Sequence, residues 1–181
     1  MSRILWVRVG LVALLAAAFT AGCGGSGSSG AGETEGTTTT AAAERLTSAQ
    51  WSEYETSRAA LREANAKATA TLKKCPATTS FGDTAEFQSC VGDTFTDLST
   101  AADNSLSTLE SFDGTVSGSC ADALANLTNY VGTFRNSAAK MQTTVDTANL
   151  AAYPAASQDL QVSLTAGKSE AQTFEQECSP D

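Results

Sequence analysis

The fold is decided by residues 120–148, whose sequence is CADALANLTNYVGTFRNSAAKMQTTVDTA. Apolar side chains recur along this stretch in alternating steps of four and three residues, which is the period of one face of an α-helix. We therefore predict a long helix that begins after a cap at Ser117 or Ser119. Its apolar face consists of Cys120, Leu124, Leu127, Val131, Phe134, Ala138, Met141, Val145 and Ala148.

Three more helices are predicted on either side of this one. The first spans about 47–74, because Thr47 and Gln50 have the spacing of a capping box at its start. The second spans about 83–113 and the fourth about 154–178, both with the same helical period. Short connections favour antiparallel neighbours. The predicted fold class is therefore all-α, a four-helix up-down-up-down bundle with two disulfides.

The four cysteines of the predicted bundle select one pairing. In an up-down bundle, Cys75 and Cys90 lie near one end, and Cys120 and Cys178 lie near the other. A disulfide needs Cα atoms within about 7 Å, so both other pairings would have to span most of the length of the bundle. We predict the disulfides Cys75–Cys90 and Cys120–Cys178.

The second of these disulfides also sets the register of the last two predicted helices. Counting away from Cys120 and Cys178 in an antiparallel pair places Gly167 opposite Val131 and close to Phe134. Glycine is unfavourable inside a helix. We therefore expect that this position holds a glycine because these two side chains leave no room for a larger residue.

The first two predicted helices carry complementary charge. Between Asp83 and Asp113 the second helix has seven acidic and no basic residues. Ion pairs such as Arg62 with Asp103 are expected to join it to the first helix. The basic residues available there are Arg58, Arg62, Lys67, Lys73 and Lys74.

The N-terminus is typical of an export signal. Arg3 and Arg8 are followed by an apolar run, 10–21, that is short for a membrane span. The run ends in Thr20-Ala21-Gly22-Cys23, which resembles the lipobox of bacterial lipoproteins, although Thr20 stands where that family usually has Leu. The resemblance implies that residues 1–22 are removed and that Cys23 carries the lipid. The alternative is an ordinary secretory peptide that leaves Cys23 as a spare thiol.

Three segments follow from this interpretation. Residues 1–22 form the lipoprotein signal peptide, 23–43 form the lipidated cysteine with a flexible Gly/Ser/Thr tether, and 44–181 form the bundle. The tether lacks aromatic and β-branched aliphatic residues, so it cannot bury enough apolar surface to fold by itself. Its threonine run, Thr37 to Thr40, resembles the linkers of some actinobacterial lipoproteins that carry O-linked sugar, and whether this tether is glycosylated is left open.

Composition argues against several classes of function. The chain has 20 acidic and 11 basic residues, a net charge of −9 and no histidine. Without histidine, Ser-His-Asp and Cys-His catalysis are excluded, and the commonest transition-metal ligand is missing. The acidity disfavours nucleic acid as a partner. We expect no enzymatic activity, no catalytic residues, no metal site and no cofactor.

Two hypotheses of function are left open. The first is a lipid-anchored protein on the extracytoplasmic face of the cell membrane that acts as an interaction or scaffold module, engaging an envelope protein or wall component. The alternative is a carrier that binds a small apolar ligand within the bundle. Small side chains on the apolar faces motivate the carrier, and an internal cavity would favour it. Trp51, Tyr54 and Tyr153 are candidates for an aromatic cleft, although core packing is the stronger interpretation.

Overall fold

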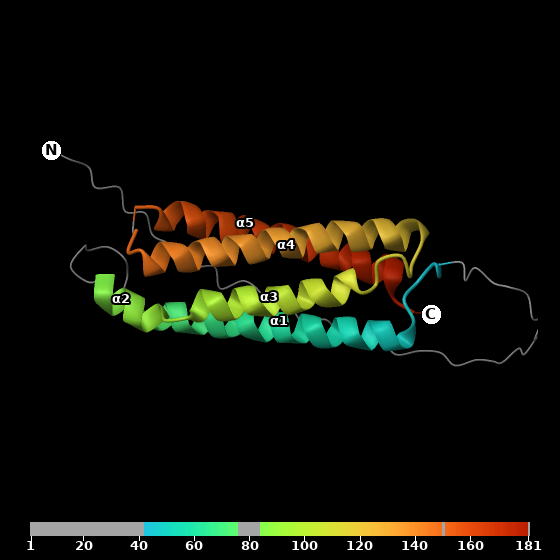
Figure 1. Cartoon of the computed structure of the whole chain (residues 1–181), viewed down its shortest axis with the longest axis horizontal. Helices are drawn as coiled ribbons and strands as arrows, with labels where there is room; N and C mark the ends of the chain where they lie inside the picture. The colour runs from blue at the N-terminus through green and yellow to red at the C-terminus, as the bar shows by residue number, and fades with distance from the viewer. Residues whose placement is uncertain (1–41, 76–83, 150, 181) are drawn as a thin grey trace, which may run out of the picture. The chain divides into compact units, whose positions relative to one another are not determined.

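The computed structural model describes residues 42–75, 84–149 and 151–180. The chain divides into two units, 1–39 and 40–181, and all of these residues belong to the second unit. This unit is all-helical (Figure 1), and within the described residues the only β-type pairing is an isolated bridge between Ala43 and Val116. The helices are α1 (Ser48–Lys74), α2 (Thr84–Val91), α3 (Thr94–Glu110), α4 (Gly118–Asp146) and α5 (Tyr153–Cys178).

The second predicted helix is interrupted, and in this respect the prediction was wrong. Two residues, Gly92 and Asp93, separate α2 from α3. Gly92 has a φ of 48°, which lies in the left-handed region where a right-handed helix ends. Because the apolar period continues across the break through Val91 and Phe95, α2 and α3 bury the same side and together replace one longer helix.

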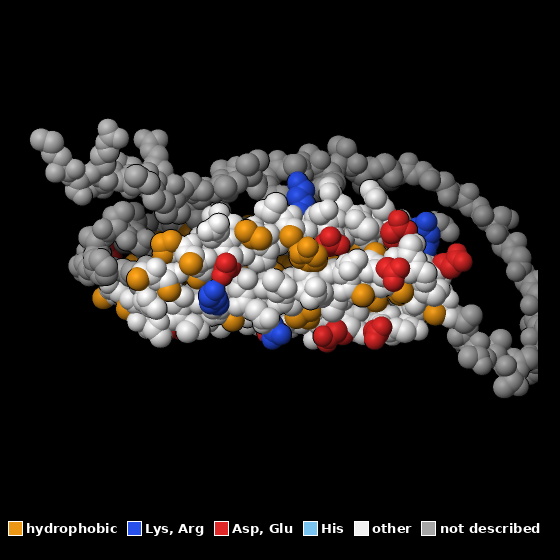
Figure 2. Space-filling model, turned by 90° about the horizontal axis from the view of Figure 1, so that it is seen from above, with side chains coloured by type: hydrophobic (Ala, Val, Ile, Leu, Met, Phe, Trp, Pro, Cys, Tyr) orange, Lys and Arg blue, Asp and Glu red, His pale blue; other side chains and the backbone are white. Residues whose placement is uncertain are grey.

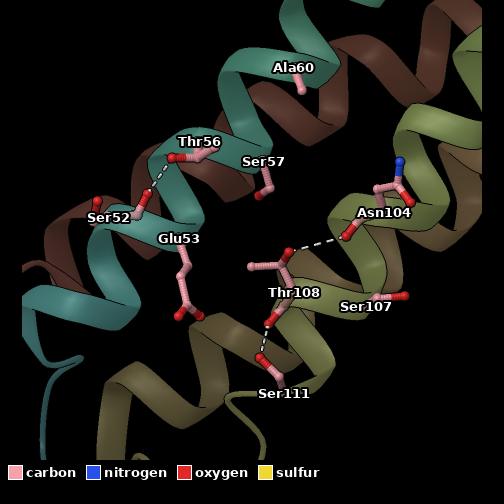
Figure 3. A pocket seen from close by; sticks show the side chains of 9 residues that line it. All are labelled: Ser52, Glu53, Thr56, Ser57, Ala60, Asn104, Ser107, Thr108 and Ser111. Carbon is pink, nitrogen blue, oxygen red and sulfur yellow. Dashed lines mark hydrogen bonds between the residues drawn. The ribbon is translucent and has the colours of Figure 1, made fainter.

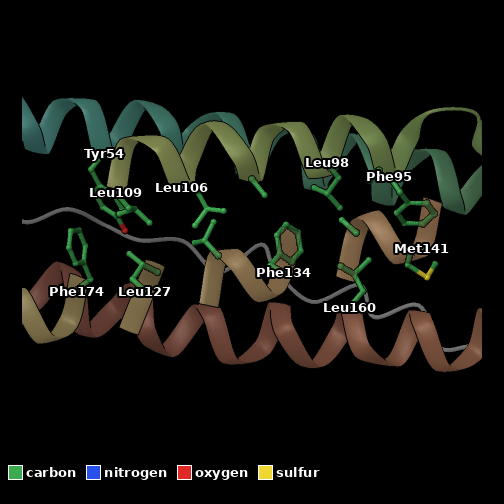
Figure 4. Close-up of a cluster of buried hydrophobic side chains, with 14 of the residues drawn as sticks. Tyr54, Phe95, Leu98, Leu106, Leu109, Leu127, Phe134, Met141, Leu160 and Phe174 are labelled. Atoms are coloured by element: carbon green, nitrogen blue, oxygen red, sulfur yellow. The ribbon is translucent and has the colours of Figure 1, made fainter. Parts of the chain in front are cut away.

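The core lies between the helices along the whole domain (Figure 4). Helix α4 packs against both α3 and α5, and α1 packs against α3. Most of the apolar face predicted for 120–148 is buried, from Cys120 through Val145. The largest fully buried side chains are Phe95, Phe112, Phe174, Leu98, Leu109, Met141, Val91, Val145, Cys120 and Cys178.

Both predicted disulfides are present. The Cα atoms of Cys75 and Cys90 lie 5.6 Å apart, and those of Cys120 and Cys178 lie 4.9 Å apart. Two further contacts continue the register set by the second disulfide. The hydroxyls of Ser137 and Ser163 are 3.1 Å apart, and Lys140 Nζ lies 2.6 Å from Asp159 Oδ2. Residue numbers on α4 therefore rise as those on α5 fall along their interface.

Charge joins α1 to α3 through one of the lysines named for this role, while the pair of Arg62 with Asp103 stays a prediction. Lys67 Nζ lies 3.0 Å from Asp97 Oδ2, with both side chains more than half exposed. Asp103 lies 3.3 Å from Arg135 of α4. Exposed pairs of this kind contribute only about 0–1 kcal/mol each to stability, so apolar packing, rather than these ion pairs, holds the helices together.

The explanation expected for Gly167 was wrong. Val131 and Phe134 are buried on α4, but a Cβ atom added at Gly167 would have no atom within 4 Å. Gly167 is itself half-buried, as are the neighbouring apolar residues Leu164 and Ala171. This part of α5 lies at the edge of the core, and its small residue is not required by crowding.

Candidate functional site

The chain enters the domain through a segment that is fixed to two other parts of the fold. The backbone N–H of Ala43 donates to the carbonyl of Thr115 at 3.1 Å, and the N–H of Ser117 donates to the carbonyl of Ala43 at 2.8 Å. A little further along, the N–H of Leu46 donates to the carbonyl of Cys178 at 3.1 Å. Leu46 is only 2% exposed. The last residue of the predicted tether is thus already part of the folded domain.

Polar side chains reinforce this entry. Arg45 Nη1 donates to the carbonyl of Ser179 at 2.9 Å, beyond the end of α5. The predicted capping box at the start of α1 is confirmed: the N–H of Gln50 donates to Thr47 Oγ1, and the N–H of Thr47 donates to Gln50 Oε1. Gln50 Nε2 also donates to Thr115 Oγ1 at 3.0 Å. The start of α1, the end of α5 and the loop before α4 therefore meet at one place, the entry end.

An aromatic cluster closes the core behind the entry. The ring centroid of Phe174 lies 4.8 Å from that of Tyr54 and 6.5 Å from that of Trp51. The hydroxyl of Tyr54 lies 3.4 Å from Glu175, which also forms an ion pair of 2.5 Å with Arg58. Burial raises the pKa of Tyr54 well above its usual range, although the positive charge of Arg58 opposes this effect. Tyr54 is therefore a neutral hydrogen-bond donor inside the fold.

The predicted aromatic cleft is not formed. Tyr153 begins α5, whereas the cluster with Trp51 and Tyr54 involves Phe174 near the end of the same helix. The Tyr153 ring instead packs edge-on against Phe87 of α2, with centroids 5.3 Å apart. Burial raises the pKa of Tyr153 as well. Both tyrosines are buried core residues, as the stronger interpretation predicted.

The other end of the domain, which we call the far end, is held by two glutamine side chains. Gln142 of α4 is 7% exposed, and its Oε1 accepts from the N–H groups of Phe95 and Thr96 at 3.1 and 3.2 Å. These are among the first N–H groups of α3, which have no partner within their own helix. Gln142 Nε2 donates to the carbonyl of Gly92 at 3.0 Å. A side chain from α4 therefore caps α3, whose own N-cap residue, Asp93, makes no side-chain capping bond.

Gln88 makes the reciprocal contact. Its Nε2 donates to the carbonyls of Val145 and Asp146, at 2.6 and 3.1 Å, near the C-terminus of α4. The last carbonyls of a helix likewise need outside partners. Neither glutamine was predicted, because a capping side chain that comes from another helix has no characteristic spacing in the sequence.

Two open hollows lie on the described surface. The first, of about 560 Å³, lies between α1 and α3 (Figure 3), and the second, of about 450 Å³, lies beside the entry segment. Hydroxyls of the first hollow donate to carbonyls of their own helix, as Thr56 does to Ser52 and Thr108 to Asn104. Both hollows are open to solvent. The first is lined by Ser52, Glu53, Thr56, Ser57, Ala60, Asn104, Ser107, Thr108 and Ser111.

The visible surface is mixed. Figure 2 shows apolar side chains dispersed among polar ones, with acidic and basic groups scattered over this face. Among the residues that the structure describes, Val162, at 62%, is the exposed large hydrophobic side chain. A single residue of this kind is normal on a soluble surface. In the same residues, no group of three or more acidic or cysteine side chains is placed to hold a metal ion.

The predicted lipidation residue, Cys23, lies outside the described residues. None of the described helices is both long and apolar enough to span a bilayer. No family model, no curated protein and no solved structure matches this chain.

Proposed function

We propose that the protein is a lipoprotein anchored through Cys23 on the extracytoplasmic face of the cell membrane, and that its helical domain is an interaction or scaffold module of the cell envelope. The observation that carries this proposal is the lipobox-like Thr20-Ala21-Gly22-Cys23 after a short apolar run. A diacylglyceryl group on Cys23 provides two acyl chains, which suffice for a stable anchor.

The fixed entry segment defines the point at which the proposed tether joins the domain. A tether that begins at Cys23 joins the domain next to Ala43, at the same end as the Cys120–Cys178 disulfide. Helix α4, with 29 residues, separates the two ends of the domain by about 43 Å at 1.5 Å per residue. The far end, with α2 and the start of α5, lies at the opposite end of the domain from the attachment at Ala43, and we assign it to the partner.

We further propose an up-down-up-down order, with α2 and α3 together as its second member. The paired contacts of α4 with α5 support opposite directions for these two helices. The carrier hypothesis has no observation in its favour beyond the small side chains of the apolar faces, and it stays a prediction.

Anchoring is tested by Cys23→Ala in a bacterial host that processes lipoproteins. Metabolic labelling with an alkyne fatty acid should label the wild-type protein and not the variant, and the variant should leave the membrane fraction or accumulate unprocessed. The double variant Cys75→Ala/Cys90→Ala is the control, because it loses two other cysteines and should stay labelled. A Cys23→Ala protein that is cleaved and still membrane-bound would refute the anchor.

The interaction role is tested separately by photo-crosslinking in intact cells. A photoreactive residue at the exposed position Ser89 on α2 should give a discrete crosslinked envelope protein, whereas the same residue at exposed Ser48, beside the entry, should not. Equal crosslinking at both positions, or at neither, would contradict a partner-binding far end without affecting the anchor.

A further inference from the structure

The short helix α2 is the least embedded helix of the domain. It has eight residues, and its packing against α1 and α4 is far slighter than the packing between the long helices. Gly92, with a φ of 48°, and Asp93 separate it from α3. Because the helix is broken there, α2 can change direction through a few backbone dihedrals without unwinding α3.

One covalent bond ties α2 back to α1. The disulfide joins Cys75, just after α1, to Cys90 within α2, and both cysteines are half-buried. The cysteines of the other disulfide, Cys120 and Cys178, are 0% exposed. Reduction of a disulfide requires a thiolate to reach one of its sulfur atoms. A reductant in solution therefore has a route to the first disulfide that the second does not offer.

Helix α2 also covers apolar groups at the far end. Phe87 and Val91, on its inner face, are 4% and 2% exposed. The Phe87 ring lies edge-on against Tyr153 at 5.3 Å between centroids. Gln88 adds a polar contact by donating to the last carbonyls of α4. If the disulfide were broken, α2 would depend on noncovalent contacts such as these to stay in place.

We propose that α2 is a flap latched by Cys75–Cys90, which a dithiol reductant opens while the rest of the domain stays folded. The dithiol transfers two electrons and two protons: the bond between the two sulfur atoms breaks, Cys75 and Cys90 become thiols, and the dithiol becomes a disulfide. The flap then turns about Gly92 and exposes its apolar face together with the Tyr153 ring. This device goes beyond the proposed function and does not depend on lipid anchoring.

Graded reduction of the oxidised full chain tests the flap. The protein is titrated with dithiothreitol, its thiols are alkylated, and the alkylated cysteines are located by mass spectrometry. Cys75 and Cys90 should be modified at reductant concentrations that leave Cys120 and Cys178 unmodified. Modification of all four cysteines over the same concentration range would overturn the proposal.

Hydrogen exchange on the partly reduced protein tests the motion itself. Amides of residues 84–91 should exchange roughly 100-fold faster than in the oxidised protein, because the crosslink no longer limits the open state. Amides of α4 and α5 should be unchanged. Unchanged protection of α2 after reduction would show that Cys75–Cys90 is not a latch.

A variant separates the latch from an effect of the reagent. Cys75→Ser/Cys90→Ser should show the fast exchange of residues 84–91 without reductant, and added dithiothreitol should not increase it further. If this variant does not fold, the partly reduced wild-type protein decides the question. A variant that folds but keeps α2 protected contradicts the proposal.

Discussion

The two ends of the bundle are closed by different means. At the entry end, the incoming backbone pairs directly with the loop before α4 and with the end of α5, and the disulfide there is fully buried. At the far end, the helix termini are capped by the side chains of Gln88 and Gln142, and the disulfide is half-buried. Backbone contacts between elements distant in sequence break only when the elements separate. Side-chain caps around a short helix allow local opening instead.

Removal of each disulfide in turn is the strongest test of this contrast. In the chain-entropy model, a crosslink over 58 residues stabilises by about 4 kcal/mol and one over 15 residues by about 3 kcal/mol. Cys120→Ala/Cys178→Ala should therefore lower the free energy of unfolding by about 4 kcal/mol. Cys75→Ala/Cys90→Ala should lower it by less than about 3 kcal/mol, because α2 opens before the rest unfolds. Denaturant melts of both double variants measure the difference.

The slope of the same melts distinguishes local from global change. If α2 is already open in Cys75→Ala/Cys90→Ala, less surface is exposed on unfolding, and the m-value should fall. The difference between the two ends would be contradicted by an unchanged m-value. It would also be contradicted if Cys75→Ala/Cys90→Ala lost more stability than Cys120→Ala/Cys178→Ala.

The caps of the far end are tested by Gln142→Ala. This change leaves the N–H groups of Phe95 and Thr96 without the partner they have in the fold. Buried polar groups left unsatisfied cost about 1–3 kcal/mol, so we expect a loss of about 2 kcal/mol in the free energy of unfolding. Gln158→Ala, at an exposed position of α5, is the control and should change it by less than about 0.5 kcal/mol. Equal effects would mean that Gln142 does not stabilise α3.

Much of the fold could be predicted from the sequence. The helical period and the capping boxes are local patterns, and the cysteine pairing depends only on the topology of the bundle. The pairing of Cys120 with Cys178 followed from helix ends, and the Thr47–Gln50 cap from spacing. The break at Gly92 was missed because the apolar period runs through it without a shift. A glycine followed by aspartate was the available signal.

The side chains that close the two ends were less predictable. Gln142 caps groups 46 and 47 residues away, so its role depends on how α3 and α4 are packed. The docking of Ala43 next to Val116 is likewise a contact between distant backbone segments, and the composition of the tether gave no sign of it. The lipidation of Cys23, which the sequence predicts, lies outside the described residues and stays a prediction.

Alkaline pH should weaken the entry end through Tyr54. Burial holds the pKa of Tyr54 above its unfolded value, so above about pH 10 the unfolded chain loses a proton that the folded chain keeps. Stability should then fall with rising pH by at most about 1.4 kcal/mol per pH unit for this group. Tyr54→Phe should remove that part of the slope in melts at several pH values.

The far-end counterpart is Tyr153→Phe. The pKa of Tyr153 is also raised by burial, but its ring lies under α2, and in protein whose Cys75–Cys90 bond has been reduced the opening of α2 lets it ionise without global unfolding. In that partly reduced protein, Tyr153→Phe should change the pH slope of the stability less than Tyr54→Phe does. If Tyr153→Phe changes the pH slope more than Tyr54→Phe does, the core is closed more tightly at the far end than at the entry end.

The smallest effect is expected between the ends, at two helical glycines. A Cβ atom at Gly167 would meet nothing within 4 Å, and one at Gly132 would lie 4.0 Å from Leu106 Cδ2, an ordinary contact. Alanine loses less conformational entropy than glycine on helix formation. Gly167→Ala and Gly132→Ala should therefore each raise the free energy of unfolding by about 0.5–1 kcal/mol. Gly114→Ala is the opposite control at the entry end, because its φ of 72° strains any side chain, and it should be destabilising. If Gly167→Ala is destabilising instead, side chains do crowd this position, contrary to what the structure shows.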